Sequence, residues 1–303
     1  MLVDVSEVDT SVTVLGQRWQ HPVGIAPMAY QRHAHDDGEL AMARAAAASG
    51  TMLTLSSQTT TPPDEVAAAM GEAPRWFQLY VFRDRSVTDD LVAAAREGGF
   101  GALVITVDFP VGGVRDRDRA SGFSPSHPTL LDRVAGTDGT PLTLAERHAL
   151  HDPSVSWDDI AGYAEASGLP VVIKGVLRPE DARRAVDAGA AGVVVSNHGG
   201  RQLDAVLSTA SALAPIVDSV EGRASVLVDG GIRRGWDVAR ALAVGADAVL
   251  LGRPVLWGLA TDGEAGARQV IDEIVEELES TLALIGCPRA ADLDPQYLVP
   301  RRR

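Results

Sequence analysis

The segment Ser196-Asn197-His198-Gly199-Gly200-Arg201 places a histidine and an arginine within one glycine-rich turn. An imidazole has an ordinary pKa of about 6.5, which suits proton transfer at neutral pH, so His198 is the candidate base. Arg201, together with Arg115, could bind a carboxylate through paired charge-assisted hydrogen bonds. Asp108 could orient the imidazole and stabilise its protonated form. A lone histidine is more often structural than catalytic, but this combination indicates acid–base chemistry on a carboxylate substrate.

Two glycine–arginine segments have the composition of a phosphate site. They are Asp229-Gly230-Gly231-Ile232-Arg233 and Gly252-Arg253, and each follows an apolar run. Glycines let the backbone approach an anion closely, the N-terminus of a helix supplies N–H donors, and the arginines add positive charge. A single glycine pair more often makes only a tight turn. Its recurrence after two successive apolar runs favours a bound phosphate.

Lys174 ends another apolar run, where an ammonium without a partner would be costly. Asp229 could supply the opposite charge, and so could a bound cofactor that gains negative charge during turnover. A Schiff-base lysine is also conceivable at this position. Tyr80 ends a further run and offers a phenol to the same site.

The elements that must position these residues alternate between short apolar runs and helical stretches. The runs are Val23–Met28, Met52–Ser57, Arg75–Tyr80, Ala102–Asp108, Val171–Gly175, Gly192–Asn197, Ser225–Gly231 and Ala248–Arg253. The helical stretches are Asp36–Ser49, Pro63–Met70, Ser86–Gly98, Trp157–Ser167, Pro179–Ala188, Ser208–Val220, Gly235–Val244 and Gly263–Ile285. This alternation predicts parallel strands with crossover helices, and eight units favour a closed (β/α)8 TIM barrel over an open doubly wound sheet. The candidate residues then share the rim at the carboxyl ends of the strands.

Residues 109–156 interrupt this regular alternation with a segment rich in Gly, Pro, Arg, Asp and His. A βα loop usually has about 2 to 6 residues, so a much longer one predicts a lid or substrate loop. A disordered surface excursion is the alternative. The sequence contains no sign of a second domain, and we expect residues 1–303 to form one barrel domain.

Composition limits the partners. The chain has 27 basic and 41 acidic residues and a formal net charge of −14, which disfavours nucleic acid and anionic membrane surfaces. No apolar run is long enough to span a bilayer, and Met1–Val14 does not resemble a signal peptide, so the cytoplasm is the expected location. Cys287 is the only cysteine, which excludes an internal disulfide and a cysteine-based zinc site. We expect it to be buried, and we expect no metal site.

The string from Ser196 to Asp204 closely resembles the signature of the FMN-dependent L-2-hydroxy acid oxidases and dehydrogenases, whose members oxidise glycolate, lactate, mandelate or hydroxymandelate. The likeness covers nearly the whole chain, with its motifs in order. It continues through Ala26-Pro27, Leu55-Ser56-Ser57, Phe77-Gln78-Leu79-Tyr80, Thr106-Val107-Asp108, Lys174-Gly175, Asp229-Gly230-Gly231-Ile232-Arg233 and Gly252-Arg253-Pro254.

The resemblance implies oxidation of an L-2-hydroxy acid to the 2-oxo acid, with electrons passing through FMN to oxygen or another acceptor. His198 would take the proton with help from Asp108, Arg201 and Arg115 would bind the carboxylate, and Tyr80 the 2-hydroxyl. Lys174 would stabilise the anionic reduced flavin. The remaining FMN-binding residues would be Pro27, Met28, Ala29, Ser56, Gln78, Thr106, Ser196, Asp229, Gly230, Gly231, Arg233, Gly252 and Arg253. Related enzymes are commonly tetramers, so a homo-oligomer is expected.

Two departures from the family pattern stand out. Relatives carry roughly fifty further residues before the point that matches Met1, including a tyrosine that contacts the substrate carboxylate, so we hypothesise a truncated chain or a start assigned at an internal Met. Val114 occupies a position where relatives usually have a second arginine. A flavin-binding but catalytically impaired homologue, or another FMN barrel enzyme such as a flavin-dependent isomerase, are the alternatives.

The sequence also bears on the substrate side chain and the electron acceptor. The stretch Pro27–Gln31, and Gln58 in place of an aromatic residue, are closer to the hydroxymandelate-type members. An aryl or larger 2-hydroxy acid is therefore mildly preferred over a small one. Ala29 matches the members that use oxygen.

Overall fold

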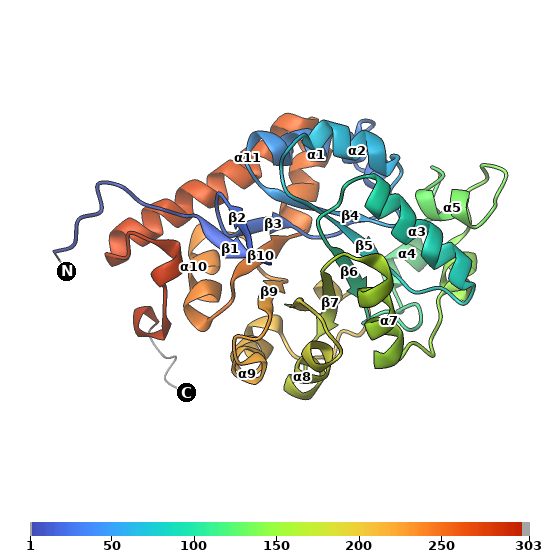
Figure 1. Cartoon of the computed structure of the whole chain (residues 1–303). Coiled ribbons are helices and arrows are strands. Elements are labelled where there is room, and N and C mark those ends of the chain that lie inside the picture. The colour runs from blue at the N-terminus through green and yellow to red at the C-terminus, as the bar shows by residue number, and fades with distance from the viewer. Residues whose placement is uncertain (1, 299–303) are drawn as a thin grey trace.

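The computed structural model describes residues 2–298, and eight parallel strands in it close into a barrel (Figure 1). Their order around the barrel follows the sequence, and β10 pairs with β3 to complete the ring. Each expected apolar run corresponds to one strand, and β7 ends one residue beyond its run, which confirms the prediction of a (β/α)8 barrel. The strands are β3 (Val23–Ile25), β4 (Met52–Ser56), β5 (Arg75–Leu79), β6 (Leu103–Thr106), β7 (Val171–Val176), β8 (Gly192–Val195), β9 (Ser225–Asp229) and β10 (Ala248–Leu251).

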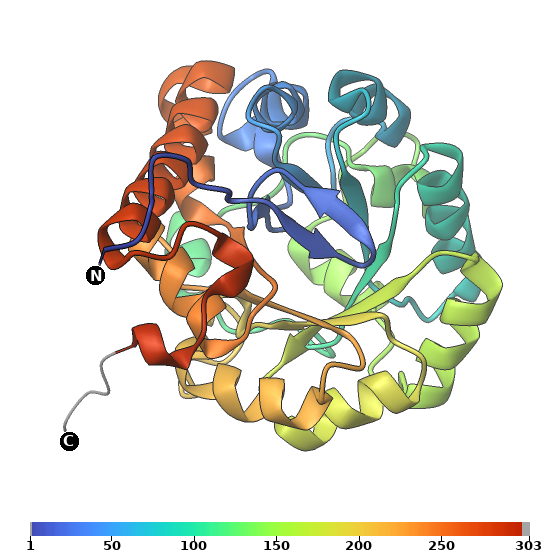
Figure 2. The ribbon, with the colours of Figure 1, turned by 60° about the vertical axis from the view of Figure 1, so that its left-hand side comes forward.

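Helices surround the barrel and bury the outer face of the strands (Figure 2). They are α1 (Gly38–Ala48), α2 (Pro63–Met70), α3 (Arg85–Glu97), α7 (Trp157–Ser167), α8 (Pro179–Asp187), α9 (Thr209–Val220), α10 (Gly235–Val244) and α11 (Arg253–Ile285). Local signals explain several starts, because proline occupies the first position of α2 and α8 and Ser156 forms a capping box at α7.

The last helix differs from its prediction. It begins at Arg253, ten residues before the expected start at Gly263, and the backbone kinks at Asp262 and Gly263. Arg253 is thus the first residue of a helix rather than the last residue of a strand. Gly263, the predicted first residue of this helix, instead lies at the kink and has a φ of 54°.

A two-stranded antiparallel hairpin lies across the end of the barrel where the strands begin (Figure 2). Its strands are β1 (Val12–Val14) and β2 (Gln17–Trp19), and neither belongs to a predicted apolar run. Trp19 is buried, and its ring centre lies 5.3 Å from that of Trp76 on β5. The hairpin therefore closes this end with apolar side chains. Cys287 is buried, as expected.

Residues 109–156, which we name the β6–α7 segment, fold into three short helices. These are α4 (Asp116–Ser121), α5 (Leu130–Val134) and α6 (Leu144–Leu150). Thr129 and Thr143 form capping boxes at the starts of α5 and α6. The alternative of a structureless excursion is therefore wrong. No helix within residues 2–298 is long and apolar enough to cross a membrane.

Candidate active site

A cavity of about 370 Å³ opens at the carboxyl ends of the barrel strands. Nearly all of the predicted site residues line it, from the ends of strands that are far apart in the sequence. Those that line it are Pro27, Met28, Ala29, Ser56, Gln78, Tyr80, Thr106, Arg115, Lys174, His198, Arg201, Asp229, Gly230, Gly231, Arg233, Gly252 and Arg253. The other two, Asp108 and Ser196, lie behind this lining and hydrogen-bond to residues that form it.

His198 and Asp108 form an oriented pair at the edge of the cavity. The two atoms in contact, His198 Nδ1 and Asp108 Oδ1, are 2.8 Å apart. Burial alone would raise the pKa of Asp108, but the charge of Lys174 and the hydrogen bond with His198 outweigh it and lower the pKa. Because an ionised carboxylate only accepts hydrogen bonds, Nδ1 carries a proton and Nε2 is left to accept one.

The backbone at His198 is held in an unusual conformation. Its φ of 55° is in the left-handed region, which is uncommon for a residue other than glycine. The backbone N–H of His198 donates to Ser196 Oγ at 3.1 Å, which fixes the turn after β8. Strained backbone of this kind is concentrated at functional sites, because the surrounding structure must enforce it.

Lys174 is buried at the end of β7 and has the anionic partner that its burial requires. Its Nζ lies 3.5 Å from Asp229 Oδ2, and Ser196 Oγ bridges the two groups at 3.1 Å and 2.9 Å. The exposed fractions of the Lys174 and Asp229 side chains are 5% and 9%. A positive charge is thereby held at the floor of the cavity.

Arg115 and Arg201 reach the cavity from different segments and meet at one carboxylate. Arg115 Nη1 lies 3.7 Å and Arg201 Nη2 lies 3.8 Å from Asp118 Oδ2. Burial, followed by the nearby charge of Arg115, lowers the pKa of Arg201. Two guanidinium groups that share one acid leave this side of the cavity positively charged. Val114, the position that departs from the family pattern, is exposed and does not line the cavity.

The opposite side of the cavity has an open glycine-rich surface. Gly230 and Gly231 have φ values of 85° and 84°, which favour glycine. A Cβ added at Gly231 or at Gly252 would meet no atom within 4 Å among the described residues. Arg253, at the N-terminus of α11, donates from Nη2 to Gly199 O at 3.0 Å. Such a surface, with a helix N-terminus and Arg233 beside it, fits a phosphate group.

Several buried polar atoms of the cavity residues have no hydrogen-bond partner within residues 2–298. They are Gln78 Nε2, Thr106 Oγ1 and Asp229 Oδ1. A buried polar atom without a partner costs about 1 to 3 kcal/mol, so such atoms in a cavity indicate a polar ligand. A ligand that satisfied these atoms would need both donor and acceptor groups.

Other cavity residues were not among the predicted site residues. Tyr30 and Gln58 follow β3 and β4, whereas Phe109, Leu144 and His148 come from the β6–α7 segment. The sequence offered one usable signal for the last two, because Thr143 and Glu146 have the spacing of a capping box and predict the helix that carries them. Nothing in their local sequence indicates that this helix covers the cavity.

Comparison with known proteins identifies the class of this barrel. A family model described as FMN-dependent dehydrogenase matches residues 1–300. The chain is 47% identical over 310 residues to an L-lactate oxidase of Nostoc sp., covering 98% of this chain and 85% of the relative. It is 47% identical over 305 residues to glycolate oxidase 3 of Arabidopsis thaliana, covering 98% and 83%. A solved structure of mandelate oxidase with (S)-4-hydroxymandelic acid is 43% identical, with a TM-score of 0.89 over 96% of this chain and 83% of the other.

The fold and these relatives define an FMN-dependent oxidoreductase. The chain belongs to the FMN-dependent dehydrogenase family, among relatives that are 2-hydroxy acid oxidases. The resemblance seen in the sequence is thereby confirmed, as is FMN as the cofactor. The cavity fits FMN, because the unpartnered atoms of Gln78 and Thr106 can face a ring edge while the open glycines and arginines face a phosphate.

Proposed function

We propose that the protein oxidises an L-2-hydroxy acid to the corresponding 2-oxo acid, with oxygen or another molecule as the final electron acceptor. The observation that carries the proposal is the His198–Asp108 pair, whose imidazole lines the same cavity as Arg115 and Arg201 while Asp108 supports it from behind. A base beside two guanidinium groups suits a substrate that loses a proton next to a carboxylate. When bound, FMN supplies the two-electron acceptor for this oxidation.

The substrate carboxylate would bind between Arg115 and Arg201. These guanidinium groups now share Asp118, and a carboxylate in the cavity would give them a closer anionic partner. Tyr80 would donate to the 2-hydroxyl. Burial raises the pKa of the Tyr80 phenol, so it remains a neutral donor throughout the physiological pH range.

His198 would take the proton at Nε2, because Nδ1 is committed to Asp108. The ionised Asp108 would then stabilise the imidazolium that forms. Lys174 would contribute a buried positive charge where negative charge accumulates during the oxidation. Met28, Ala29, Ser56, Gln78 and Thr106 would contact the flavin ring, and Arg233 and Arg253 would hold its phosphate.

The substrate class is a mandelate-like or lactate-like acid, and the larger of the two is preferred. Support comes from Gln58 at the cavity wall and from the similarity to structures of mandelate oxidase. A homo-oligomer, in particular a tetramer, is part of the proposal through the family likeness. The alternatives are a flavin protein without turnover and a flavin-dependent isomerase.

An anaerobic spectrum separates these functions. We expect the FMN-loaded protein to lose its yellow colour when L-mandelate, L-lactate or glycolate is added without oxygen. A yellow protein that no 2-hydroxy acid bleaches would refute the proposal and favour the alternatives. The expected product is the 2-oxo acid, which chromatography would identify.

Substitution of the base gives a sharper test. We expect His198→Ala to retain FMN but to lose about 10²- to 10⁴-fold in the rate of flavin reduction, because general base catalysis is removed while the phosphate surface is intact. His35→Ala is the matched control, since His35 lies outside the cavity lining. Equal rates in the two variants would show that His198 is not the base.

A further inference from the structure

Tyr30 and Gln58 lie across the cavity from the proposed base. Gln58 follows β4 and His198 follows β8, and these strands are four positions apart in the closed ring of eight. For a substrate with its carboxylate at Arg201 and its 2-carbon at His198, we therefore expect the side chain to extend toward the side of the cavity where Gln58 lies. This inference rests on the proposed function. It concerns the side chain of the substrate, to which none of the predicted site residues was assigned.

Tyr30 and Gln58 are joined by two hydrogen bonds. The backbone N–H of Tyr30 donates to Gln58 O at 3.3 Å, and Tyr30 Oη donates to Gln58 Oε1. Burial raises the pKa of Tyr30 to about 12, so the phenol keeps its proton and acts as the donor. The carboxamide oxygen of Gln58 is thereby occupied.

The carboxamide nitrogen of Gln58 remains available as a donor. Within residues 2–298, Gln58 Nε2 makes no hydrogen bond, and it is not among the buried atoms sealed from the cavity. Gln58 lines the same cavity as Leu144 and His148. The far wall of the substrate cavity thus presents N–H donors within otherwise apolar and aromatic surroundings.

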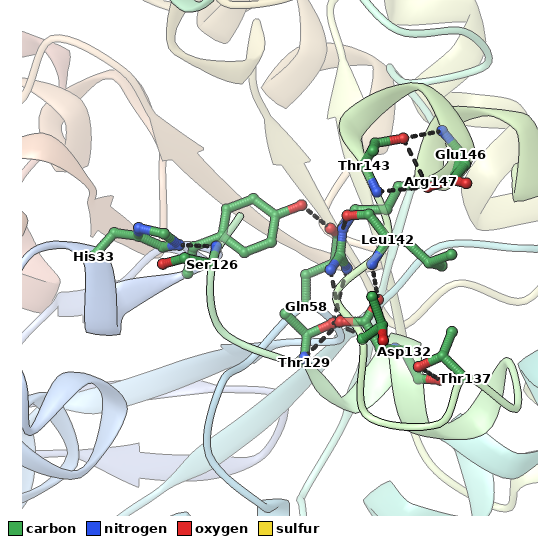
Figure 3. A network of polar contacts seen from close by, with 12 residues as sticks. His33, Gln58, Ser126, Thr129, Asp132, Thr137, Leu142, Thr143, Glu146 and Arg147 are labelled. Atoms are coloured by element: carbon green, nitrogen blue, oxygen red, sulfur yellow. Dashed lines mark hydrogen bonds and ion pairs between the residues drawn. The ribbon is translucent and has the colours of Figure 1, made fainter. Parts of the chain in front are cut away.

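A buried ion pair of the β6–α7 segment holds Tyr30 in place. The guanidinium carbon of Arg147 lies 5.3 Å from the centre of the Tyr30 ring. Arg147 is itself fixed, because it donates to Leu142 O at 3.0 Å, Thr129 Oγ1 at 2.8 Å and Asp132 Oδ2 at 2.6 Å (Figure 3). The left-handed φ of 59° at Tyr30 also requires such support.

We propose that Gln58, oriented by Tyr30, determines specificity by donating a hydrogen bond to an oxygen on the substrate side chain. The preferred substrates are then 2-hydroxy acids whose side chain carries a hydroxyl or ether oxygen, such as hydroxyaryl acids. Phe109, Leu144 and His148 pack around the body of such a side chain. A site built to donate to a substrate oxygen disfavours the analogue that lacks it, because the buried donor is then left unpaired.

The test compares FMN reduction by (S)-4-hydroxymandelate and by (S)-mandelate under anaerobic conditions. We expect the unmodified enzyme to prefer the hydroxylated acid by about 5- to 10-fold in kcat/KM. Gln58→Met keeps the length of the side chain but removes its donors, so the ratio of kcat/KM for the two acids falls to about one. Gln269→Met, the same substitution on the outer surface of α11, leaves the preference unchanged.

Tyr30→Phe tests the orientation of the carboxamide. We expect it to reduce the preference partly, because Gln58 remains but is no longer held. The Tyr30→Phe variant also keeps the inference testable if Gln58→Met fails to retain FMN. A second readout is the dissociation constant of the FMN-loaded enzyme for 4-hydroxybenzoylformate and for benzoylformate, followed by the change in flavin absorbance, and Gln58→Met should remove the difference.

Two outcomes overturn the inference. The first is an unmodified enzyme that reduces its flavin equally fast with both acids, and the second is a Gln58→Met variant that keeps the preference. Either result leaves the proposed function intact, since flavin is still reduced by a 2-hydroxy acid. If no 2-hydroxy acid reduces the flavin, the proposed function fails and this inference fails with it.

Discussion

Two buried ion pairs in this protein differ in how completely the chain satisfies them. In the β6–α7 segment, Arg147 Nη2 lies 2.6 Å from Asp132 Oδ2, and the exposed fractions of the two side chains are 1% and 0%. Arg147 donates to three acceptors, and Asp132 also accepts from the backbone N–H groups of Thr129 and Leu142. Every polar group of this pair therefore has a partner from the chain itself.

The pair at the floor of the cavity is less complete. Lys174 Nζ and Asp229 Oδ2 are 3.5 Å apart and are bridged by Ser196 Oγ, while Asp229 Oδ1 has no partner within residues 2–298. A buried carboxylate oxygen without a partner is destabilising, and a bound ligand could supply the missing hydrogen bond. The comparison separates a pair that stabilises a loop from a pair that is arranged for a bound molecule.

Removing one member of the complete pair should have the largest effect. We expect Arg147→Met to lower the free energy of unfolding by about 3 to 5 kcal/mol, because Asp132 is left buried without its counter-charge. Urea unfolding of the FMN-free protein, followed by circular dichroism, measures this change. Arg268→Met, which breaks an exposed pair with Asp272, is the control and should change the free energy by less than about 1 kcal/mol. Similar losses in both variants would contradict the comparison.

His151 is a buried imidazole that forms no ion pair within residues 2–298, and it should make stability depend on pH. Burial lowers its pKa to about 4 from the ordinary value of 6.5, and its Nε2 has no partner within residues 2–298. The unfolded chain binds the proton more readily, so the stability present above about pH 6.5 is lost as the pH falls toward 4, by about 3 kcal/mol.

The measurement is urea unfolding between pH 7 and pH 4 for the protein and for His151→Phe. The variant keeps an aromatic ring against Tyr80 and Phe109 but has no proton to bind. We expect its loss of stability on acidification to be smaller by about that amount. If the free energy of unfolding fell equally with pH in the two proteins, His151 would not be buried in its neutral form.

Removing Lys174 from the incomplete pair should lower the free energy of unfolding less than the other two changes, but it should lower the rate of flavin reduction. We expect Lys174→Met to lower the free energy of unfolding of the FMN-free protein by about 1 to 2 kcal/mol, because the two charges are 3.5 Å apart rather than 2.6 Å and Asp229 lines the open cavity. The rate of flavin reduction by a 2-hydroxy acid should fall at least about tenfold. Urea unfolding and anaerobic stopped-flow absorbance measure the two effects. A loss of stability equal to that of Arg147→Met would mean that both pairs are structural.

The barrel and most of the cavity could be predicted because their signals are local. Each apolar run corresponds to a strand, and in a parallel barrel the residues that follow the strands share one rim, so Lys174, His198 and Asp229 were expected to converge. The β1–β2 hairpin was not predicted, since each of its strands has only three residues and too few positions to show a period. The predicted start of α11 was wrong, because the sequence Gly252-Arg253 is equally compatible with the end of a strand.

The sequence by itself determined the order of strands and helices, the family and the residues at the strand ends, because hydrophobic periodicity and motif spacing are properties of short segments. Only the tertiary structure decided that Arg147 lies on Tyr30, that Tyr30 orients Gln58, and that α6 covers the cavity. These contacts join segments whose separation in space depends on the closure of the barrel and the path of the β6–α7 segment. The same holds for the unpartnered atoms of Gln78 and Thr106, since whether a buried polar atom has a partner depends on all of its neighbours.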